Sequence, residues 1–392
     1  MPVSTMCASN CRPCRKPLTP SWRVCAKQGY RRAEWRQGGA RPYADKPSIA
    51  VLPFDNLSGD VEQEYFSDGM AEDLITDLSK ISGLSVAARN SSFSFKGQMP
   101  DVREVAEKLG VKFVLEGSVR KMGERLRINA QLINAVDGKH LWAERYDGDM
   151  AEIFDLQDRI RGEIVEALEV QLTPTDKSRA KKRRTESVEA YDHYLKARNG
   201  YFRYSPEGLK DAFDNLNKAL EIDPDFAEAH AYLSTCHVST YVFRWLELDV
   251  GLEKALRAAE KAIDLDPESA VAYSRLGWVH SWLANFEISE ECFLRAIELE
   301  PDLAEAYPYY GVLKVRWGDH ERALELTGKG QELDPGLLSE FHLGMEYLFL
   351  RRFDQAIENL EAARNRNPKQ NWVRLHLAAA YIETGRTEDA RA

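Results

Sequence analysis

The seven residues KALEIDP, Lys218–Pro224, decide the fold of the second half of this chain, because related phrases return four times after them. The later phrases are KAIDLDP at 261–267, RAIELEP at 295–301, KGQELDP at 329–335 and AARNRNP at 362–368. Their closing prolines are 43, 34, 34 and 33 residues apart. A proline cannot continue a helix, so each phrase reads as the end of one. The sequence therefore predicts an array of helical repeats over residues 188–392.

A period of 34 residues with a closing proline is typical of the tetratricopeptide repeat, a helix–turn–helix unit that stacks on its neighbours. Small residues recur where the two helices of a unit would pack closely: Gly200, Gly277, Gly311 and Gly344 in the first helices, and Ala212, Ala255, Ala323 and Ala356 in the second. We predict an all-α superhelical solenoid of five whole repeats and a truncated sixth, and we expect the natural chain to continue. The longer first interval predicts a longer helix pair or loop around STYVFRWLELDVG.

The inner face of this solenoid is our candidate site for a protein or peptide partner. Carrying the repeat numbering forward places nine residues there: Arg275, Trp278, Trp282, Tyr309, Phe341, His342, Met345, Trp372 and His376. Aromatic residues, Met and Arg are enriched in binding interfaces, and an aromatic groove suits a peptide or a helix. The alternative is that several of these residues only pack between neighbouring helices. Pro308 lies inside a predicted first helix and is expected to kink it.

Residues 47–172 alternate between strand-like and helix-like patterns and predict one α/β domain with a mixed sheet. The apolar run SIAVLPF, Ser48–Phe54, suits a strand buried on both faces. An amphipathic helix follows, and Ser67 or Asp68 is expected to cap it. Further along, Asp137-Gly138 is a strong signal for a β-hairpin turn. The predicted order of elements is β-α-β-α-β-β-β-α.

The loop after the first strand lies where many nucleotide-binding domains hold a phosphate, but its charge argues against that role. In this stretch no Lys or Arg occurs before Lys80, while the loop and the first helical turns carry seven acidic residues: Asp55, Asp60, Glu62, Glu64, Asp68, Glu72 and Asp73. A phosphate loop needs a glycine-rich backbone and a lysine, which are missing from this stretch. A Ca²⁺ or Mg²⁺ site is the alternative, although no EF-hand spacing is present. We predict a non-enzymatic chain with no catalytic residues, no cofactor and no metal.

The first 46 residues are basic and rich in cysteine, and we predict a disordered extension. They contain ten Lys and Arg against two acidic residues. The spacing of Cys11 and Cys14 is that of a zinc site, which Cys7 and Cys25 would complete, so zinc is the alternative. After the α/β domain, residues 173–187 are predicted to be a linker. We interpret the basic run Lys181–Arg184 inside it as a solvated hinge.

The charge and hydropathy of the chain narrow the classes of partner. The formal net charge is −10, although the first 46 residues are basic. Each contact with a nucleic-acid phosphate needs a Lys or Arg, so an acidic body argues against nucleic acid. No run approaches the roughly 18 apolar residues of a membrane span, and no apolar segment follows the basic start as in a secretory signal. We expect a cytoplasmic chain, or a periplasmic or membrane-associated one if it belongs to a larger membrane protein.

Two histidines of the repeat region need an interpretation. His230 and His237 are two helical turns apart and would face one side of a helix. Metal binding is possible in principle, but these positions hold large core residues in this kind of repeat, so we expect core packing. Cys236 and Cys292 are expected to be buried thiols for the same reason.

The segment 49–172 resembles the TolB amino-terminal-like domain of bacterial signalling proteins. The resemblance rests on IAVLPFDNLSGDVEQEYFSDGMAEDLITDLS, ARNSSFSFKG, LGVKFVLEGSVRKMGERLRINAQLINAVDGKHLWAERYDGD and IFDLQDRI. With tetratricopeptide repeats after it, the chain is similar to the carboxy-terminal part of proteins that begin with a class III adenylate/guanylate cyclase domain. A similar part occurs in CadC-like transcriptional regulators with a winged-helix domain. In place of such an effector domain this sequence has 46 basic, cysteine-rich residues, in which we expect no room for the cyclase's catalytic residues.

The two readings of function differ in what this chain does alone. The first is a non-enzymatic scaffold of a bacterial signalling system that binds a protein partner through the groove of the repeats. The second is the regulatory or sensory portion of a cyclase, or of a CadC-like regulator, whose effector domain is missing from this chain.

Overall fold

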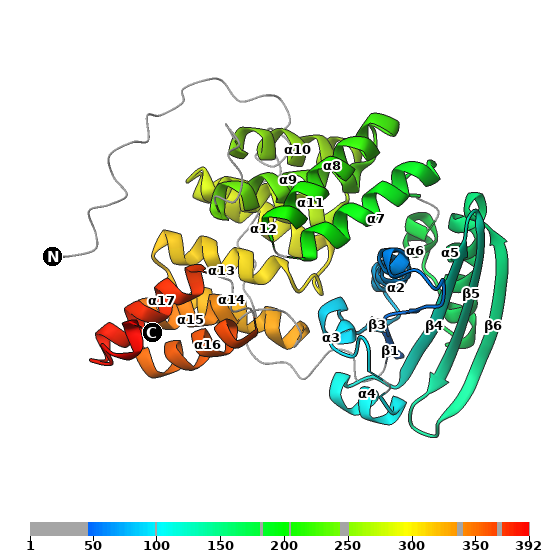
Figure 1. The fold of residues 1–392 in the computed structure, drawn as a ribbon, viewed down its shortest axis with the longest axis horizontal. Coiled ribbons are helices and arrows are strands. Elements are labelled where there is room, and N and C mark those ends of the chain that lie inside the picture. Colours follow the sequence, from blue (N-terminus) through cyan, green and yellow to red (C-terminus); the bar gives the residue numbers. More distant parts are fainter. Residues whose placement is uncertain are drawn as a thin grey trace. The chain divides into compact units, whose positions relative to one another are not determined.

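The computed structural model shows a mixed β-sheet with its helices, followed by an array of helix pairs (Figure 1). It describes residues 46–98, 100–180, 183–203, 205–243, 251–334, 340–366 and 371–391. These residues belong to one compact unit. The predicted fold class, an α/β part followed by an all-α array, is confirmed.

The sheet has the strand order β3-β1-β4-β5-β6, and a short strand β2 pairs with β4. The strands are β1 (Ser48–Val51), β2 (Asp55–Asn56), β3 (Ser85–Val86), β4 (Phe113–Met122), β5 (Arg125–Asn134) and β6 (Lys139–Asp149). β1 is parallel to β3 and β4, whereas β4, β5 and β6 are antiparallel neighbours. The turns between the last three strands contain Gly123 and Gly138, whose φ angles of 60° and 72° favour glycine. The sheet is therefore mixed, as the sequence predicts.

Both faces of the first strand are buried, in agreement with its uninterrupted apolar sequence. Ile49 and Val51 join the main core, while Ala50 packs in a second cluster with Val105 of α4 (Val102–Leu109). The main core also receives the apolar sides of α2 (Glu64–Ser79) and α5 (Ile153–Ala167). Alternate residues of a strand point to opposite faces, so these two clusters lie on opposite sides of the sheet.

The first long helix begins earlier than the sequence predicts. A 3-10 turn, η3 (Val61–Gln63), is capped by the Asp60 side chain and leads directly into α2. The expected cap at Ser67 or Asp68 is therefore wrong. Ser67 is buried in the first turn of α2, three residues after its start, and Asp68 makes an ion pair of 2.5 Å with Lys96. The apolar stripe of this helix is buried as expected: Met70, Leu74, Leu78 and Ile81.

Three short elements were missed by the sequence pattern. They are β2, α3 (Arg89–Phe93) and α6 (Pro174–Ala180), which lies inside the predicted linker. Asp176 of α6 is buried and accepts hydrogen bonds from the Ser82 amide at 3.2 Å and from the Ser82 hydroxyl at 3.0 Å. This part of the connection is consequently packed against the α/β part.

The described chain after α6 forms five helix pairs and the beginning of a sixth. The pairs are α7 (Val188–Phe202) with α8 (Pro206–Ile222), α9 (Ala227–Phe243) with α10 (Gly251–Leu265), α11 (Ala270–Trp282) with α12 (Phe286–Leu299), α13 (Ala306–Trp317) with α14 (His320–Leu333), and α15 (Glu340–Phe349) with α16 (Phe353–Arg366). α17 (Asn371–Glu383) and η5 (Asp389–Arg391) follow. Part of the longer stretch between α9 and α10 lies outside the described residues.

Glycines of the first helices stand where a second helix approaches closely. A Cβ atom added at Gly200 would lie 2.9 Å from the Gly208 carbonyl oxygen, and one at Gly311 would lie 2.5 Å from Thr327 Oγ1. The packing role predicted for these small residues is confirmed. Pro308 lies in the first turn of α13, where its missing amide hydrogen has no intrahelical acceptor to lose. The kink that we expect from this proline is therefore not required.

Candidate functional site

The first helices of successive repeats present one recurring position, two residues before the small packing residue. We call the residues at this position the first-helix row: Arg198, Tyr232, Arg275, Tyr309, His342 and His376. Neighbours in the row are in contact at two steps. The Arg198 guanidinium carbon lies 6.0 Å from the centre of the Tyr232 ring, and that of Arg275 lies 5.5 Å from the centre of the Tyr309 ring. The row therefore brings a cation and a ring together at each of these two steps.

The structure brings together the aromatic residues predicted on α11 and α13. The ring centre of Trp278 lies 4.7 Å from that of Tyr309 and 5.4 Å from that of Trp282. The guanidinium of Arg316 lies 4.6 Å over the Trp282 ring. All three aromatic side chains are half-buried. The buried indole N–H of Trp282 has no hydrogen-bond partner in the described part of the chain. We call Trp278, Trp282 and Tyr309 the aromatic cluster.

A second group of predicted residues lies on α15 and α17. The ring of Phe341 lies 5.3 Å from His376 and 5.6 Å from His342. These three residues and Met345 are half-buried. The predicted groove residue Trp372 has its side chain outside the described residues. The C-terminal end of the row thus carries histidine rings beside Phe341 and is partly accessible wherever it is described.

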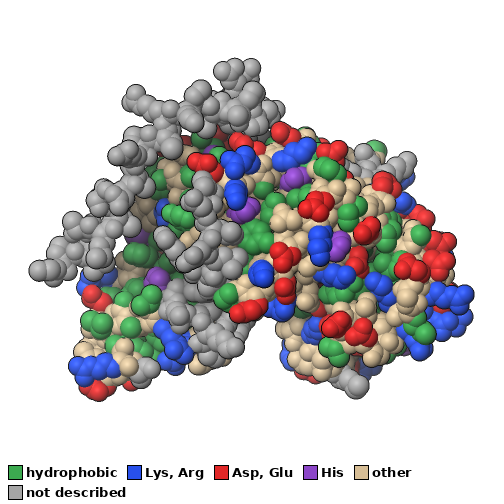
Figure 2. All heavy atoms as spheres, turned by 45° about the horizontal axis from the view of Figure 1, so that its top comes forward, with side chains coloured by type: hydrophobic (Ala, Val, Ile, Leu, Met, Phe, Trp, Pro, Cys, Tyr) green, Lys and Arg blue, Asp and Glu red, His purple; other side chains and the backbone are tan. Residues whose placement is uncertain are grey.

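Exposed apolar side chains continue beyond these two groups. Figure 2 shows hydrophobic side chains interspersed with acidic and basic ones on the visible face. At the C-terminal ends of three first helices, Tyr241, Trp317 and Phe349 expose 41%, 39% and 51% of their surface. Exposed aromatic residues next to charged ones are typical of protein interfaces.

Arg275 has a different environment from the aromatic residues around it. It is only 4% exposed, and one of its terminal nitrogens lies 2.7 Å from a carboxylate oxygen of Glu305. Burial lowers the pKa of Arg275, but the Glu305 carboxylate outweighs it and holds the pKa above its usual value. The Nε and Nη1 atoms of Arg275 have no hydrogen-bond partner among the described residues. A buried N–H group without an acceptor destabilises the folded protein, so these atoms are a place where an acceptor would bind favourably.

The first residue of the row, Arg198, is bound by helix α2 of the α/β part. One terminal nitrogen of Arg198 donates to Asp73 at 2.9 Å, and the other donates to Glu72. The Tyr191 hydroxyl also donates to Asp73, and Gln157 donates to Tyr191 at 2.8 Å. The acidic side of α2, in which the sequence indicated only repulsion of phosphate, is therefore the surface that docks on the first repeat.

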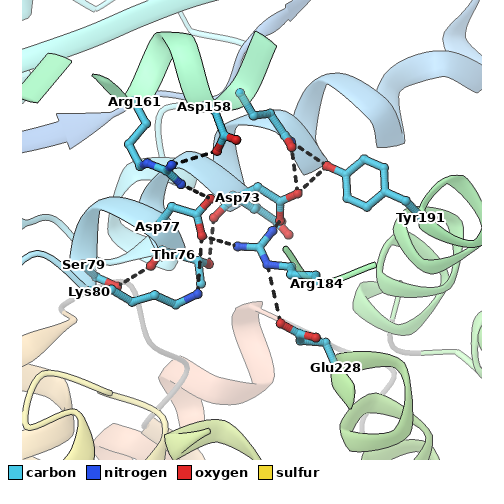
Figure 3. A network of polar contacts seen from close by, with 12 residues as sticks. Asp73, Thr76, Asp77, Ser79, Lys80, Asp158, Arg161, Arg184, Tyr191 and Glu228 are labelled. Carbon is cyan, nitrogen blue, oxygen red and sulfur yellow. Dashed lines mark hydrogen bonds and ion pairs between the residues drawn. The ribbon is translucent and has the colours of Figure 1, made fainter. Parts of the chain in front are cut away.

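A second arginine joins this buried network, as Figure 3 shows. Arg184 lies 2.5 Å from Asp73, 2.8 Å from Asp77 and 3.7 Å from Glu228. Burial raises the pKa of Asp77, but Arg184, Lys80 and Arg161 outweigh it and hold the pKa below its usual value. The interpretation of the basic run as a solvated hinge is wrong for Arg184, because four-fifths or more of its side chain is buried among carboxylates.

Contacts between the α/β part and the array extend to later repeats. Asp334, the last described residue before the loop that follows α14, accepts hydrogen bonds from the Ser91 amide at 3.0 Å and from the Asn90 side chain at 2.8 Å. Ser79 donates to Glu300, which follows α12, at 3.4 Å. Both acids precede the closing proline of a repeat. The acid before each closing proline can be recognised in the sequence, but the residues to which these acids bind cannot.

The histidines and cysteines outside the row fit a packed core. His237 is buried, and burial lowers its pKa to about 4. His230 is half-buried and lies 2.9 Å from the Pro224 carbonyl oxygen. Cys236 and Cys292 are buried, as expected. Among the described residues, no three His, Cys, Asp or Glu side chains group as a metal site requires. The four N-terminal cysteines lie outside the described residues.

A membrane span is not found either: within the described ranges, every helix is too short or too polar to cross a bilayer.

Comparison with known families matches two parts of the chain. Residues 270–303 and 350–392 match tetratricopeptide repeat models, and residues 44–163 match the second domain of HilA/YgeH-like transcriptional regulators. The chain thus contains tetratricopeptide repeats, and a mixed-sheet α/β part lies ahead of them. The TolB-like resemblance of that part stays a prediction.

One curated relative and several solved structures are similar to this chain. "Putative adenylate cyclase 3" of Rhizobium meliloti (strain 1021) is 51% identical over 200 residues, which are 51% of this chain and 34% of the relative. The chain therefore spans about a third of that relative's length. TTC0263, a thermophilic TPR protein of Thermus thermophilus, is 18% identical with a TM-score of 0.41, covering 48% of this chain and 99% of its own. The type IV pilus biogenesis factor PilW is 17% identical with a TM-score of 0.40, covering 52% and 89%.

Proposed function

We propose that this chain is a non-enzymatic module of a signalling system, which binds a protein partner through the first-helix row from α11 to α17. The observation that carries the proposal is the aromatic cluster, which gathers half-buried Trp and Tyr rings from two repeats at one place. Trp, Tyr and Arg dominate the binding energy of protein interfaces. Tetratricopeptide repeats supply such surfaces by stacking.

The occupied end of the row supports the same function. At the first repeat, helix α2 of the same chain lies against Arg198 and is held by its carboxylates. The row thus has the chemistry to bind a helix, which is one of the recurring modes of peptide recognition. A partner from outside would use the third and later repeats, where the row residues other than Arg275 are half-buried.

Substitution of the aromatic cluster tests this function. The variant Trp278→Ala/Trp282→Ala should lose at least about tenfold in partner capture, because truncated interface tryptophans cost about 2 kcal/mol or more. Leu141→Ala is the control, since Leu141 is 44% exposed on β6 and lies outside the repeats. Captured proteins would be quantified by mass spectrometry, with helix content checked by far-UV circular dichroism. Equal capture by all three proteins would contradict the proposal.

A second candidate function is favoured by the similar proteins. The relative named as an adenylate cyclase and the match to a transcriptional regulator's second domain both suggest the regulatory portion of a larger protein. In that case the row would bind the partner that controls an effector domain. Cyclic nucleotide formation from ATP or GTP by this chain alone, with Mg²⁺ or Mn²⁺ present, would contradict both candidates.

A further inference from the structure

Two arginines stand at the same position of the first-helix row but have different partners. Arg198 of the first repeat binds the carboxylates of Glu72 and Asp73 on α2. Arg275 of the third repeat pairs with Glu305 and lies beside Tyr309. Its Nη1 atom, and its Nε atom like that of Arg198, lack acceptors among the described residues. The repeat unit is shared, so the occupied position shows what the other one is built to bind.

Helix α2 shows the kind of ligand that fits this row. Tyr65 donates to Asp192 of α7 at 2.6 Å, and a Cβ atom added at Gly69 would lie 2.7 Å from Leu195. Tyr65, Gly69 and the Glu72–Asp73 pair are one, two and three turns along the same side of α2. Phe66 and Met70 lie on the adjoining side of α2, because Asp73 follows them by seven and three residues, and both are buried in the core. The bound ligand is therefore an acidic amphipathic helix with a small residue at the closest approach.

We propose that Arg275 receives a carboxylate from an acidic amphipathic helix of the partner, and that Glu305 occupies this place when the partner is absent. The inference rests on the proposed function and names the partner's chemistry. A carboxylate and an arginine form charge-assisted hydrogen bonds, which are roughly twice as strong as neutral ones. The free N–H groups of Arg275 give the incoming carboxylate donors that Glu305 does not use.

The environment of the pair allows this exchange. The Glu305 side chain is 36% exposed although Arg275 is almost completely buried, so the pair opens to solvent on the glutamate side. A partly exposed carboxylate can leave at small cost because water solvates it. The rings of Trp278 and Tyr309 lie next to Arg275 and would receive the apolar side of the helix. The competing explanation is that Arg275 and Glu305 form only an internal structural pair.

A fluorescein-labelled peptide with the α2 sequence, Glu64–Ser79, is the probe, and its twin carries Glu72→Gln and Asp73→Asn. Fluorescence anisotropy with the full chain should show the acidic peptide binding about tenfold more tightly than the twin. This factor corresponds to the low end of the free energy of a hydrogen bond to a charged group.

The Arg275→Gln variant should bind both peptides equally. The Glu305→Gln variant should bind the acidic peptide more tightly than the unchanged chain, because the competitor is gone. Arg257→Gln, an exposed arginine of the second helix α10, is the matched control and should change nothing.

The results separate this inference from the proposed function. Equal binding of the two peptides, abolished by Trp278→Ala, would overturn the role of Arg275 and leave the aromatic groove standing. Failure of both peptides to bind would also overturn it, while partner capture would still decide the proposed function. If Arg275→Gln does not fold, Glu305→Gln decides alone: unchanged affinity for the acidic peptide contradicts the inference.

Discussion

The first repeat and the third to fifth repeats present the same row of positions to different neighbours. At Arg198 the row is covered by α2 and closed by buried ion pairs. From Tyr309 to His376 it presents half-buried rings, next to the half-buried aromatic cluster, whereas Arg275 is buried. The helical repeat itself is alike at both ends, so the α/β part, and not the repeat, decides which positions are left for a partner.

The two regions also differ in the forces that hold them. The first region uses carboxylates and guanidinium groups removed from water, which stabilise only while every charge keeps its partner. The later region uses aromatic contacts, whose energy is spread over many atoms and is tolerant of small shifts. A single substitution should therefore be far more damaging at the α2 contact than in the aromatic cluster.

The largest effect is expected from Asp73→Ala. Asp73 is 1% exposed and holds Arg184, Arg198 and Tyr191, so its loss takes a carboxylate partner from each of two buried cations. The free energy of unfolding should fall by about 3–5 kcal/mol. Urea denaturation of the full chain measures it. Asp155→Ala, which removes a 69% exposed carboxylate paired with Arg183, should cost below about 1 kcal/mol. Similar losses in the two variants would refute the contrast.

Glu346 should make the stability of the later repeats fall as the pH rises. It is fully buried in α15, burial raises its pKa from 4.5 to about 8, and the Thr327 hydroxyl donates to it at 2.6 Å. The unfolded carboxyl ionises near pH 4.5 while the folded one keeps its proton. Stability is therefore complete below pH 4.5 and is lost as the pH rises towards 8, on the order of 2–4 kcal/mol in total.

Glu346→Gln tests this assignment, because the variant cannot ionise. It should be more stable than the unchanged chain at about pH 9 and show no such gain at about pH 4.5. The exposed Glu358, on the neighbouring helix α16, supplies the control Glu358→Gln. A gain that is the same at both pH values would show that Glu346 does not titrate as expected.

For the α2 contact, the lowered pKa of Asp77 predicts the opposite dependence of stability on pH. The contribution of Asp77 is present above pH 3.8 and is lost as the pH falls further.

Gly311→Ala should destabilise the later repeats through packing alone. The added methyl group would lie 2.5 Å from Thr327 Oγ1 and 3.0 Å from Glu346 Oε1, so the two helices must separate. A cost of about 1–3 kcal/mol is expected for overpacking. Gly328→Ala in the adjoining helix meets no atom within 4 Å and should stabilise by roughly 0.5–1 kcal/mol. Thermal unfolding of both variants measures the difference in sign.

The smallest effect is expected from His280 in the third repeat. It is 4% exposed, and burial lowers its pKa from 6.5 to about 4. Its stabilising contribution is present above pH 6.5 and is lost as the pH falls through this range, by about 1–2 kcal/mol at pH 5. His280→Leu should therefore lose less stability than the unchanged chain between about pH 7.5 and pH 5. Parallel pH profiles of the two proteins would contradict a buried neutral histidine.

The sequence predicted the elements whose signals are local. The closing prolines and small residues located the helix pairs, and Asp137-Gly138 located a hairpin turn. The acid-rich start of α2 was read as a helix terminus, because no local rule says that a carboxylate will find an arginine more than 100 residues away. The first-helix row was found only from Arg275 onward. Counting two residues back from Gly200 would have added Arg198.

By itself, the sequence determined the period of the array and the alternation of the sheet, since each depends on spacing along a few turns or residues. Only the tertiary structure decided that Glu72 and Asp73 bind Arg198, that Arg184 is buried, and that Asp334 reaches Ser91. The physical reason is that ion pairs and hydrogen bonds are formed by closeness in space. Folding brings those charges together and removes them from water, where a charge without its partner destabilises the fold.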